Sequence, residues 1–176
     1  MPKKVQWYIV GDGTFTFDVD DVEIKAGSTE DLPDYNDDDY DLSCSGNECT
    51  LTMSDGQTFV GINNNGIVTF HAVPFAQAPV GELRWKSPVL RTHYPEPVDA
   101  TEPGYNCATF QTVDDPSKQN QSEDCLHINI QVQKWVLDRK RKLPVVAYIH
   151  GGAFNFGTNN DDMSSLVSQG MNDFGH

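Results

Sequence analysis

The stretch LPVVAYIHGGAFNFG, residues 143–157, combines a short apolar run with a turn that contains two glycines. Residues 145–149 follow Pro144 without a charged side chain, which is typical of a buried strand in a parallel sheet. Ligands of such sheets bind at the carboxyl ends of the strands, where Gly151 and Gly152 fall. Glycine has no Cβ, so the backbone can take a positive φ and approach a ligand closely. The stretch predicts a turn that points N–H groups at a ligand, and an ordinary strand-ending turn is the alternative.

The length and composition are those of one soluble domain with a core of its own. The chain has 176 residues, of which 38% are hydrophobic, and this suits a single globular unit. The sequence predicts no membrane span. The apolar run at residues 5–10 is interrupted by Gln6 and is too short for the core of a secretory leader, so no recognisable signal peptide is expected.

Negative charge is concentrated in the first part of the chain. The net charge is −14, and residues 1–50 carry 13 acidic and 3 basic side chains. This balance excludes nucleic acid as an expected partner. The densest stretch, EDLPDYNDDDYD at residues 30–41, resembles a calcium-binding loop only poorly. Counted from Asp34, it has Asp39 where such a loop has glycine and Ser45 where it has glutamate. We interpret it as a solvated acidic loop.

The four cysteines favour two local disulfides. Their spacings resemble neither a metal site nor a redox motif, so no metal is expected. Three pairings are open, and we favour Cys44 with Cys49 and Cys107 with Cys125. Disulfides form in oxidising compartments, so this pairing predicts a secreted or extracytoplasmic protein despite the missing leader.

A change in composition near Thr50 predicts two parts, an acidic and partly loop-like segment at residues 1–49 and a patterned region at residues 50–176. In the first part, strands are expected only at residues 5–10 and 14–19. In the second, Asn65-Gly66 is a strong hairpin turn, and it predicts that residues 58–62 pair with residues 67–70.

Further along the chain, the pattern predicts a long connection and then new regular elements. Prolines accumulate from Pro74 to Pro103, which indicates an extended loop over the surface. Apolar and polar residues then alternate over residues 126–132, as in a strand with one solvated face. The basic residues 139–142 are interpreted as an exposed hairpin end, and a short helix is expected within residues 162–171.

Three stretches together resemble a known family. They are VPFAQAPVGELRWKSP (73–88), SEDCLHIN (122–129) and the opening stretch, in this order. The series is similar to the N-terminal part of type-B carboxylesterases, which include cholinesterases, some fungal lipases and non-catalytic adhesion relatives. The resemblance covers roughly residues 50–160. It implies an α/β-hydrolase fold, of which this chain holds the leading antiparallel strands and the first core strands of a mostly parallel sheet. It also implies ester hydrolysis by serine, histidine and an acidic residue, without a cofactor.

The resemblance assigns roles to the glycine turn. The backbone N–H groups of Gly152 and Ala153 match two donors of the family's oxyanion hole. Such donors stabilise the negative charge that the ester oxygen acquires in the tetrahedral intermediate. His150 and Gly151 match positioning residues of the motif, and His150 is not expected to be the catalytic base.

Two further pairs follow from the resemblance. Cys107 and Cys125 match the family's first disulfide. Arg84 and Glu123 match a pair that forms a structural salt bridge in relatives; two ordinary surface charges are the alternative.

The residues of the catalytic triad are not recognisable in this sequence. None of the ten serines has glycine both two residues before and two residues after it, as a nucleophile elbow requires. None of the five histidines matches the family's base. We therefore expect the N-terminal fragment of a serine carboxylic-ester hydrolase, whose complete form acts on a small-molecule carboxylic ester. A non-catalytic binding or adhesion relative is the alternative, and an acidic, secreted calcium-binding protein is a third.

Overall fold

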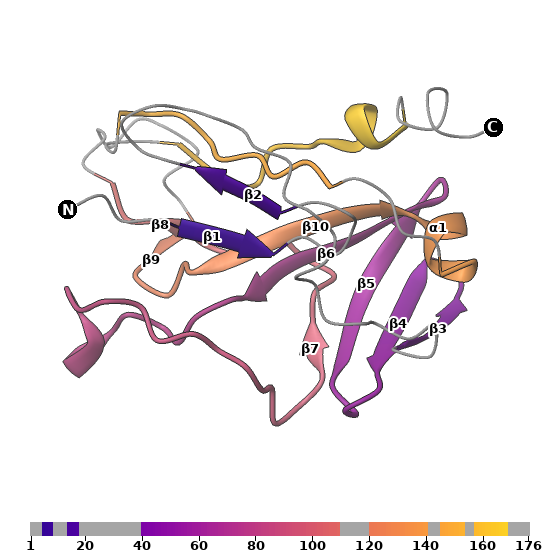
Figure 1. The fold of residues 1–176 in the computed structure, drawn as a ribbon, viewed down its shortest axis with the longest axis horizontal. Coiled ribbons are helices and arrows are strands. Elements are labelled where there is room, and N and C mark those ends of the chain that lie inside the picture. The colour runs from indigo at the N-terminus through magenta and orange to yellow at the C-terminus, as the bar shows by residue number, and fades with distance from the viewer. Residues whose placement is uncertain are drawn as a thin grey trace.

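The structure is a computed structural model, which describes residues 5–8, 14–17, 40–109, 120–140, 145–153 and 157–168. Its centre is a twisted sheet with the strand order β10-β6-β5-β4-β3 (Figure 1), in which all neighbours are antiparallel. The strands are β3 (Tyr40–Ser45), β4 (Glu48–Met53), β5 (Thr58–Asn64), β6 (Ile67–Pro74) and β10 (His127–Gln133). A two-residue strand, β7 (Val98–Asp99), pairs in parallel with β5.

Tight turns join the first four of these strands. Asn65 and Gly66 connect β5 to β6 with φ values of 52° and 87°, and two positive φ angles match the right-handed twist of a hairpin. The predicted hairpin is therefore confirmed, but the residues that pair across it are Ile62–Asn64 with Ile67–Thr69, and of the predicted range 58–62 only Ile62 pairs with β6. Gly46, with φ of 61°, lies in the turn between β3 and β4. Because β4 begins at Glu48 and continues the sheet, the composition change at Thr50 falls inside a strand.

Strand β6 leaves β5 part-way and continues along β10. It pairs with β5 only up to Ile62 and Thr69, and it pairs with β10 as far as Pro74, with a bulge between Ile128 and Ile130. Ala72 lies at this bulge with φ of 51°, a left-handed conformation that costs a residue with a Cβ roughly 1–2 kcal/mol.

The core lies on one face of the sheet. Its buried members are Cys49, Val68, Phe70, Val73 and Ala100. The disulfide Cys44–Cys49 links directly opposed residues of β3 and β4, and it packs within this cluster. The core therefore forms between hairpins that are close in sequence.

A short helix, α1 (Lys134–Asp138), follows β10 in a segment for which the sequence had predicted no element. The predicted hairpin end, residues 139–142, comes directly after it, and only Arg139 and Lys140 of that stretch are described. Val136 on this helix is buried, and the Tyr40 hydroxyl donates to the Leu137 carbonyl at 3.1 Å. Lys134 Nζ lies 2.7 Å from Asp138 Oδ1, an i,i+4 pair that favours the helical turn. Burial of one apolar residue explains why the segment turns back on the sheet.

The proline-rich connection crosses the surface, as predicted. It contains a 3₁₀ turn, η2 (Gly81–Leu83), and a bridge between Ala76 and Leu90. Tyr94 anchors it: the ring packs edge-on against Phe59 with centroids 5.2 Å apart, and the hydroxyl donates to the Pro74 carbonyl. In Figure 1 this connection extends away from the strands of the sheet.

Two small strand pairs complete the described regular structure. The expected strands at residues 5–10 and 14–19 are confirmed as the hairpin of β1 (Val5–Tyr8) with β2 (Thr14–Phe17). The acidic stretch, except its last two residues, lies outside the described residues. Strands β8 (Asn106–Cys107) and β9 (Gln121–Ser122) pair in parallel, next to the disulfide Cys107–Cys125.

Two sequence predictions are wrong in this fold. Residues 145–149 form no strand, because a parallel strand needs neighbours and the described residues pair none with it. On β10, the side chains of Ile128 and Ile130 are 41% and 43% exposed. The polar side chains that alternate with them were expected in solvent, but they are half-buried or, at Gln133, buried. The reason is the segment 157–168, which lies along the polar side of β10.

Candidate functional site

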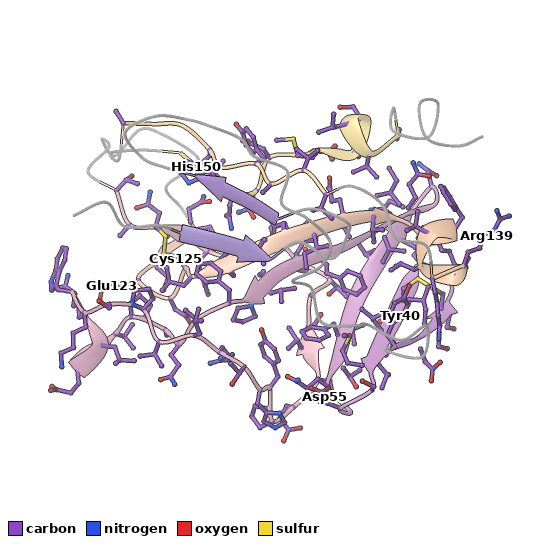
Figure 2. The ribbon with its side chains drawn as sticks, in the orientation of Figure 1. Tyr40, Asp55, Glu123, Cys125, Arg139 and His150 are labelled. Atoms are coloured by element: carbon purple, nitrogen blue, oxygen red, sulfur yellow. A yellow bond between two sulfur atoms is a disulfide. The ribbon has the colours of Figure 1, made fainter. Side chains whose placement is uncertain are left out.

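The turn at residues 150–153 follows an apolar segment that is open to solvent. Val146, Tyr148 and Ile149 are 72%, 57% and 67% exposed. Figure 2 shows His150 at the opposite end of the molecule from Tyr40 and Arg139. The turn therefore lies away from helix α1 and its contacts with the sheet.

The backbone of the turn has the conformation that only small residues adopt readily. Gly152 has φ of 130° and Ala153 has φ of 50°. Successive backbone N–H groups in turns form the anion-binding concavities of many proteins. Gly151 has an ordinary φ and nothing within 4 Å of where a Cβ would stand. The positive φ angles thus fall at the two residues predicted as donors.

His150 and Gly157 close this turn on itself. The imidazole Nδ1 of His150 lies 2.8 Å from the carbonyl oxygen of Gly151; since a carbonyl only accepts, Nδ1 carries the hydrogen. At Gly157, φ is 124°, and a Cβ would stand 2.5 Å from the Gly151 oxygen and 2.7 Å from His150 Cε1. No side chain fits there. The His150 ring therefore makes its contacts within its own loop.

The segment after the turn is held to the sheet by an asparagine clamp, which we define as Asn106, Asn129, Asn159 and Asn160. Asn129 is its centre, because its amide has partners on both sides. Its Oδ1 accepts from the N–H of Ala72 at 2.8 Å, while its Nδ2 donates to the Asn159 carbonyl at 2.7 Å and to Asn160 Oδ1 at 3.1 Å. One side chain thus joins the bulge of β6 to the segment that leaves the turn.

The other members extend the clamp to β8 and to the start of β10. Asn160 Nδ2 donates to the Gly104 carbonyl at 3.1 Å, and Asn159 Nδ2 donates to the His127 carbonyl at the same distance. His127 Nδ1 lies 3.0 Å from Asn159 Nδ2, and its Nε2 lies 2.8 Å from the Tyr105 carbonyl oxygen. A neutral ring with its hydrogen on Nε2 satisfies both partners.

Further along, the same segment continues to contact β10. Gln133 Nε2 donates to the Val167 carbonyl at 2.6 Å. Residues 164–168 are helical, which agrees with the predicted helix as far as Ser168; residues 169–171 lie outside the described part. Asp162 Oδ1 accepts from the Ser164 N–H at 2.9 Å, and hydrogen bonds from Ser164 lower the pKa of this exposed carboxyl.

Among the described residues, two buried side-chain polar atoms lack a hydrogen-bond partner. They are Nδ1 of His71 on β6 and Oε1 of Gln131 on β10. Burial lowers the pKa of His71, and the negative charge of Glu102 opposes this shift. The neutral form of His71 is therefore favoured in the folded protein.

The predicted salt bridge and the second disulfide lie together. Arg84 Nε donates to Glu123 Oε1, with the two side chains 51% and 44% exposed. An exposed pair of this kind contributes about 0–1 kcal/mol, so its role is local. The same guanidinium lies 5.1 Å from the ring centroid of Trp85, which is 89% exposed. Glu123 is two residues before Cys125, so the ion pair links η2 to the disulfide.

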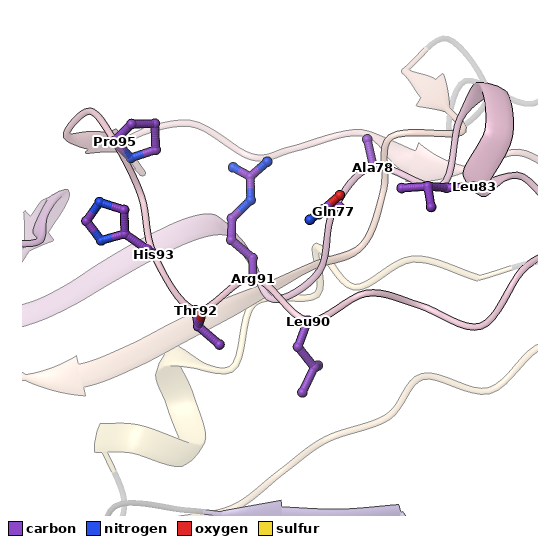
Figure 3. Close-up of a pocket in the computed structure, with 8 residues that line it drawn as sticks. All are labelled: Gln77, Ala78, Leu83, Leu90, Arg91, Thr92, His93 and Pro95. Carbon is purple, nitrogen blue, oxygen red and sulfur yellow. The ribbon is translucent and has the colours of Figure 1, made fainter.

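A pocket of about 530 Å³ lies on the proline-rich connection, and it includes no residue of the turn. Its lining is amphipathic, with Gln77, Arg91, Thr92 and His93 beside Leu83 and Leu90. Figure 3 shows the Arg91 side chain between His93 and Gln77, while Leu90 points the other way. The guanidinium also lies 5.8 Å from the ring centroid of Tyr94. The pocket and the turn are separate features of the surface.

The described residues show neither a metal-binding cluster nor a membrane-spanning helix. Among the described residues, no three histidine, cysteine, aspartate or glutamate side chains are grouped so that they could hold a metal ion. Within the same ranges, no helix has both the length and the apolar character that crossing a membrane requires.

Comparison with known families identifies the lineage of the chain. Residues 54–171, well over half of the chain, match the carboxylesterase family. The chain belongs to the carboxylesterase family. This confirms the resemblance drawn from the three stretches of sequence.

Individual relatives agree with this family assignment. It is 34% identical to para-nitrobenzyl esterase of Bacillus subtilis (strain 168) over 117 residues, which are 62% of the chain and 23% of the relative. It is 38% identical to venom carboxylesterase-6 of Apis mellifera over 101 residues, 55% of the chain and 18% of the relative. The chain thus spans about a fifth of the length of these relatives.

The fold is similar to that of solved esterases. A crystal structure of juvenile hormone esterase from Manduca sexta superposes with a TM-score of 0.58 at 31% identity, covering 69% of the chain and 24% of the esterase. The predicted fold class, part of an α/β-hydrolase, is confirmed. The mostly antiparallel strands described above are therefore one portion of that fold.

Sequence reasoning identified the turn and missed the clamp. Asn129 was quoted only as the last residue of a family stretch, and Thr158, Asn159 and Asn160 carried no role. A usable signal was present: a run of polar residues follows a glycine turn, and amide side chains alternate along residues 129–133. Amides on a strand that must pack against another segment predict hydrogen bonds between the two.

Proposed function

We propose that the chain is the N-terminal portion of a serine carboxylic-ester hydrolase and supplies two donors of its oxyanion hole, the N–H groups of Gly152 and Ala153. The observation that carries the proposal is the left-handed backbone at these two residues. Preorganised N–H groups stabilise an oxyanion more than the neutral carbonyl from which it forms, and this difference lowers the barrier. The domain in question is residues 50–176, preceded by the acidic segment 1–49, whose last residues, in β3 and at the start of β4, join the same sheet.

The nucleophile, acid and base belong to the portion of the hydrolase that this sequence does not match. His150 keeps its Nδ1 hydrogen on the Gly151 carbonyl, an arrangement suited to shaping the turn. The substrate class is a small-molecule carboxylic ester. The two disulfides support an oxidising, extracytoplasmic place of action.

The experiment is a chimera built on para-nitrobenzyl esterase of Bacillus subtilis, with the matching portion replaced by residues 54–171 of this chain. We expect the chimera to hydrolyse p-nitrophenyl acetate, and we expect the 176-residue chain alone to show no turnover and no labelling by a serine-directed phosphonate. The chain alone lacks a nucleophile, which leaves only a small residual catalysis.

Glycine variants of the chimera then test the donors. Gly152→Ala forces a side chain onto a φ of 130° and displaces the N–H groups; loss of one donor typically lowers kcat about a hundredfold to a thousandfold. Gly151→Ala is the matched control, since its Cβ would meet nothing within 4 Å. A folded chimera with equal kcat in both variants would refute the oxyanion role. A folded chimera without activity would favour the non-catalytic binding relative.

A further inference from the structure

The tripeptide Asn120-Gln121-Ser122 is the one place in the 176-residue sequence where asparagine is followed by any residue but proline and then by serine or threonine. This pattern is the acceptor signal for N-linked glycosylation. Chance alone produces such tripeptides, so the surroundings decide whether this one can be used.

The structure presents the acceptor on the surface. Asn120 is exposed and lies immediately before β9, in which Gln121 and Ser122 are half-buried. The carbonyl of Asn120 accepts from the N–H of Asn106 at 2.8 Å, which fixes its backbone beside β8. A modification at this position therefore projects from an ordered and accessible edge.

The asparagine clamp does not depend on Asn120. Its contact to β8 uses the side chain of Asn106, whose Oδ1 accepts from Thr158 Oγ1 at 2.5 Å and from Asn160 Nδ2 at 3.3 Å. Asn120 contributes its main-chain carbonyl to the same strand. A bulky group on the Asn120 amide can therefore be accommodated without breaking the hydrogen bonds of the asparagine clamp.

The redox chemistry of the chain agrees with the compartment in which this modification occurs. The tripeptide lies within the loop closed by Cys107–Cys125, and a second disulfide joins Cys44 to Cys49. In eukaryotes both disulfides and N-linked glycans are made in the lumen of the endoplasmic reticulum. The two disulfides and the acceptor signal thus point to the same compartment.

We infer that Asn120 is an N-glycosylation site. In the transfer, the Asn120 amide nitrogen forms a bond to C1 of the first sugar of an oligosaccharide carried on a lipid pyrophosphate. The bond from C1 to the pyrophosphate oxygen breaks, the lipid pyrophosphate leaves, and the amide nitrogen gives one proton to a base of the transferase. No atom changes oxidation state. This inference is independent of the proposed ester hydrolysis.

The test uses the full chain behind a cleavable secretion leader, translated in the presence of endoplasmic reticulum microsomes. Translocated chains are selected by their protection from added protease. Treatment with peptide-N-glycosidase F in water enriched in oxygen-18 should remove one glycan and convert Asn120 to isotope-labelled aspartate in the peptide map. The transfer takes place during translocation, so the result does not require a variant to reach its final fold.

Three substitutions and a control make the result specific. Asn120→Gln and Ser122→Ala should each abolish the glycan, whereas Ser122→Thr should retain it. Asn64→Gln is the control, because Asn64 is exposed but lacks the acceptor pattern, and it should leave the glycan in place. Protease-protected wild-type chain without a glycan would overturn the inference, and so would a glycan that persists in Asn120→Gln.

Discussion

The central sheet and the segment 145–153 are both rich in apolar residues, but only the sheet has regular secondary structure. Strands β3 to β6 are joined by tight turns, bury Val68 and Phe70, and close around a disulfide. The segment 145–153 has no regular structure and exposes Val146 and Ile149. Antiparallel hairpins find their partners among sequence neighbours, whereas a parallel strand needs partners from distant parts of a chain. An apolar stretch therefore forms a strand only where another strand is available to pair with it.

The largest effect is expected in the core. Phe70→Ala removes a side chain that is 3% exposed and should lower the free energy of unfolding by about 3–5 kcal/mol. Ile128→Ala, at a side chain 41% exposed, should cost less than about 1 kcal/mol. Urea unfolding followed by tryptophan fluorescence measures both. Similar losses in the two variants would mean that Ile128 is covered in solution and that the contrast is not real.

The next prediction concerns the link between the two regions. Asn129→Ala removes the partners of Ala72, Asn159 and Asn160, and unsatisfied groups of this kind cost about 1–3 kcal/mol. Hydrogen exchange at residues 157–160 should accelerate as the segment leaves the sheet.

Gln131→Ala is the matched control for this variant. Gln131 lies on the same side of β10, and its hydrogen bond to Asp162 Oδ1 is weak, with a donor–acceptor distance of 3.4 Å. It should leave exchange at residues 157–160 nearly unchanged. Equal acceleration in both variants would show that the clamp does not centre on Asn129.

A pH dependence should arise from His71 in the sheet. Because burial lowers its pKa in the folded state, the unfolded chain binds the proton more readily than the folded one. Stability should therefore be greatest above the unfolded value of about 6.5 and should fall as the pH drops through that value toward the folded pKa.

The variant His71→Gln should reduce this fall in stability between about pH 7.5 and pH 5.5, as measured by urea midpoints. His93→Gln, at an exposed position, is the control. An unchanged slope in His71→Gln would show that another group causes the pH dependence.

The smallest effect compares two alanines with the same backbone conformation. Ala72 in the sheet and Ala153 in the turn have φ of 51° and 50°, which glycine adopts without strain. Ala72→Gly should raise the free energy of unfolding by up to about 1 kcal/mol, because the sheet enforces this conformation. Ala153→Gly should leave global unfolding unchanged, since its segment is outside the core. An equal gain at both positions would show that the turn unfolds together with the sheet.

Much of the fold was predictable from local chemistry. The Asn65-Gly66 turn can connect strands only with two positive φ angles, so it identified the hairpin of β5 and β6, although not the residues that pair across it. Prolines at 74–103 excluded a long helix, and they lie in the surface connection. Three ordered stretches were enough to predict the family.

Other features depended on contacts between residues far apart in sequence. The five-residue helix α1 forms because Val136 is buried and the Leu137 carbonyl accepts a hydrogen bond from the Tyr40 hydroxyl. No local sequence pattern predicts these two contacts. The covered side of β10 was mispredicted because the segment 157–168, some thirty residues later, provides the carbonyl oxygens that accept hydrogen bonds from Asn129 and Gln133.

The sequence by itself determined the turns, the pairing of neighbouring strands and the glycine turn at residues 150–153, because each rests on backbone preferences within a few residues. Contacts between distant segments decided which face of β10 is covered, that His150 and Gly157 close the turn, and that no described segment pairs with residues 145–149. The physical reason is that burial and hydrogen-bond satisfaction depend on which segments meet, and the free energy of those meetings outweighs local preference.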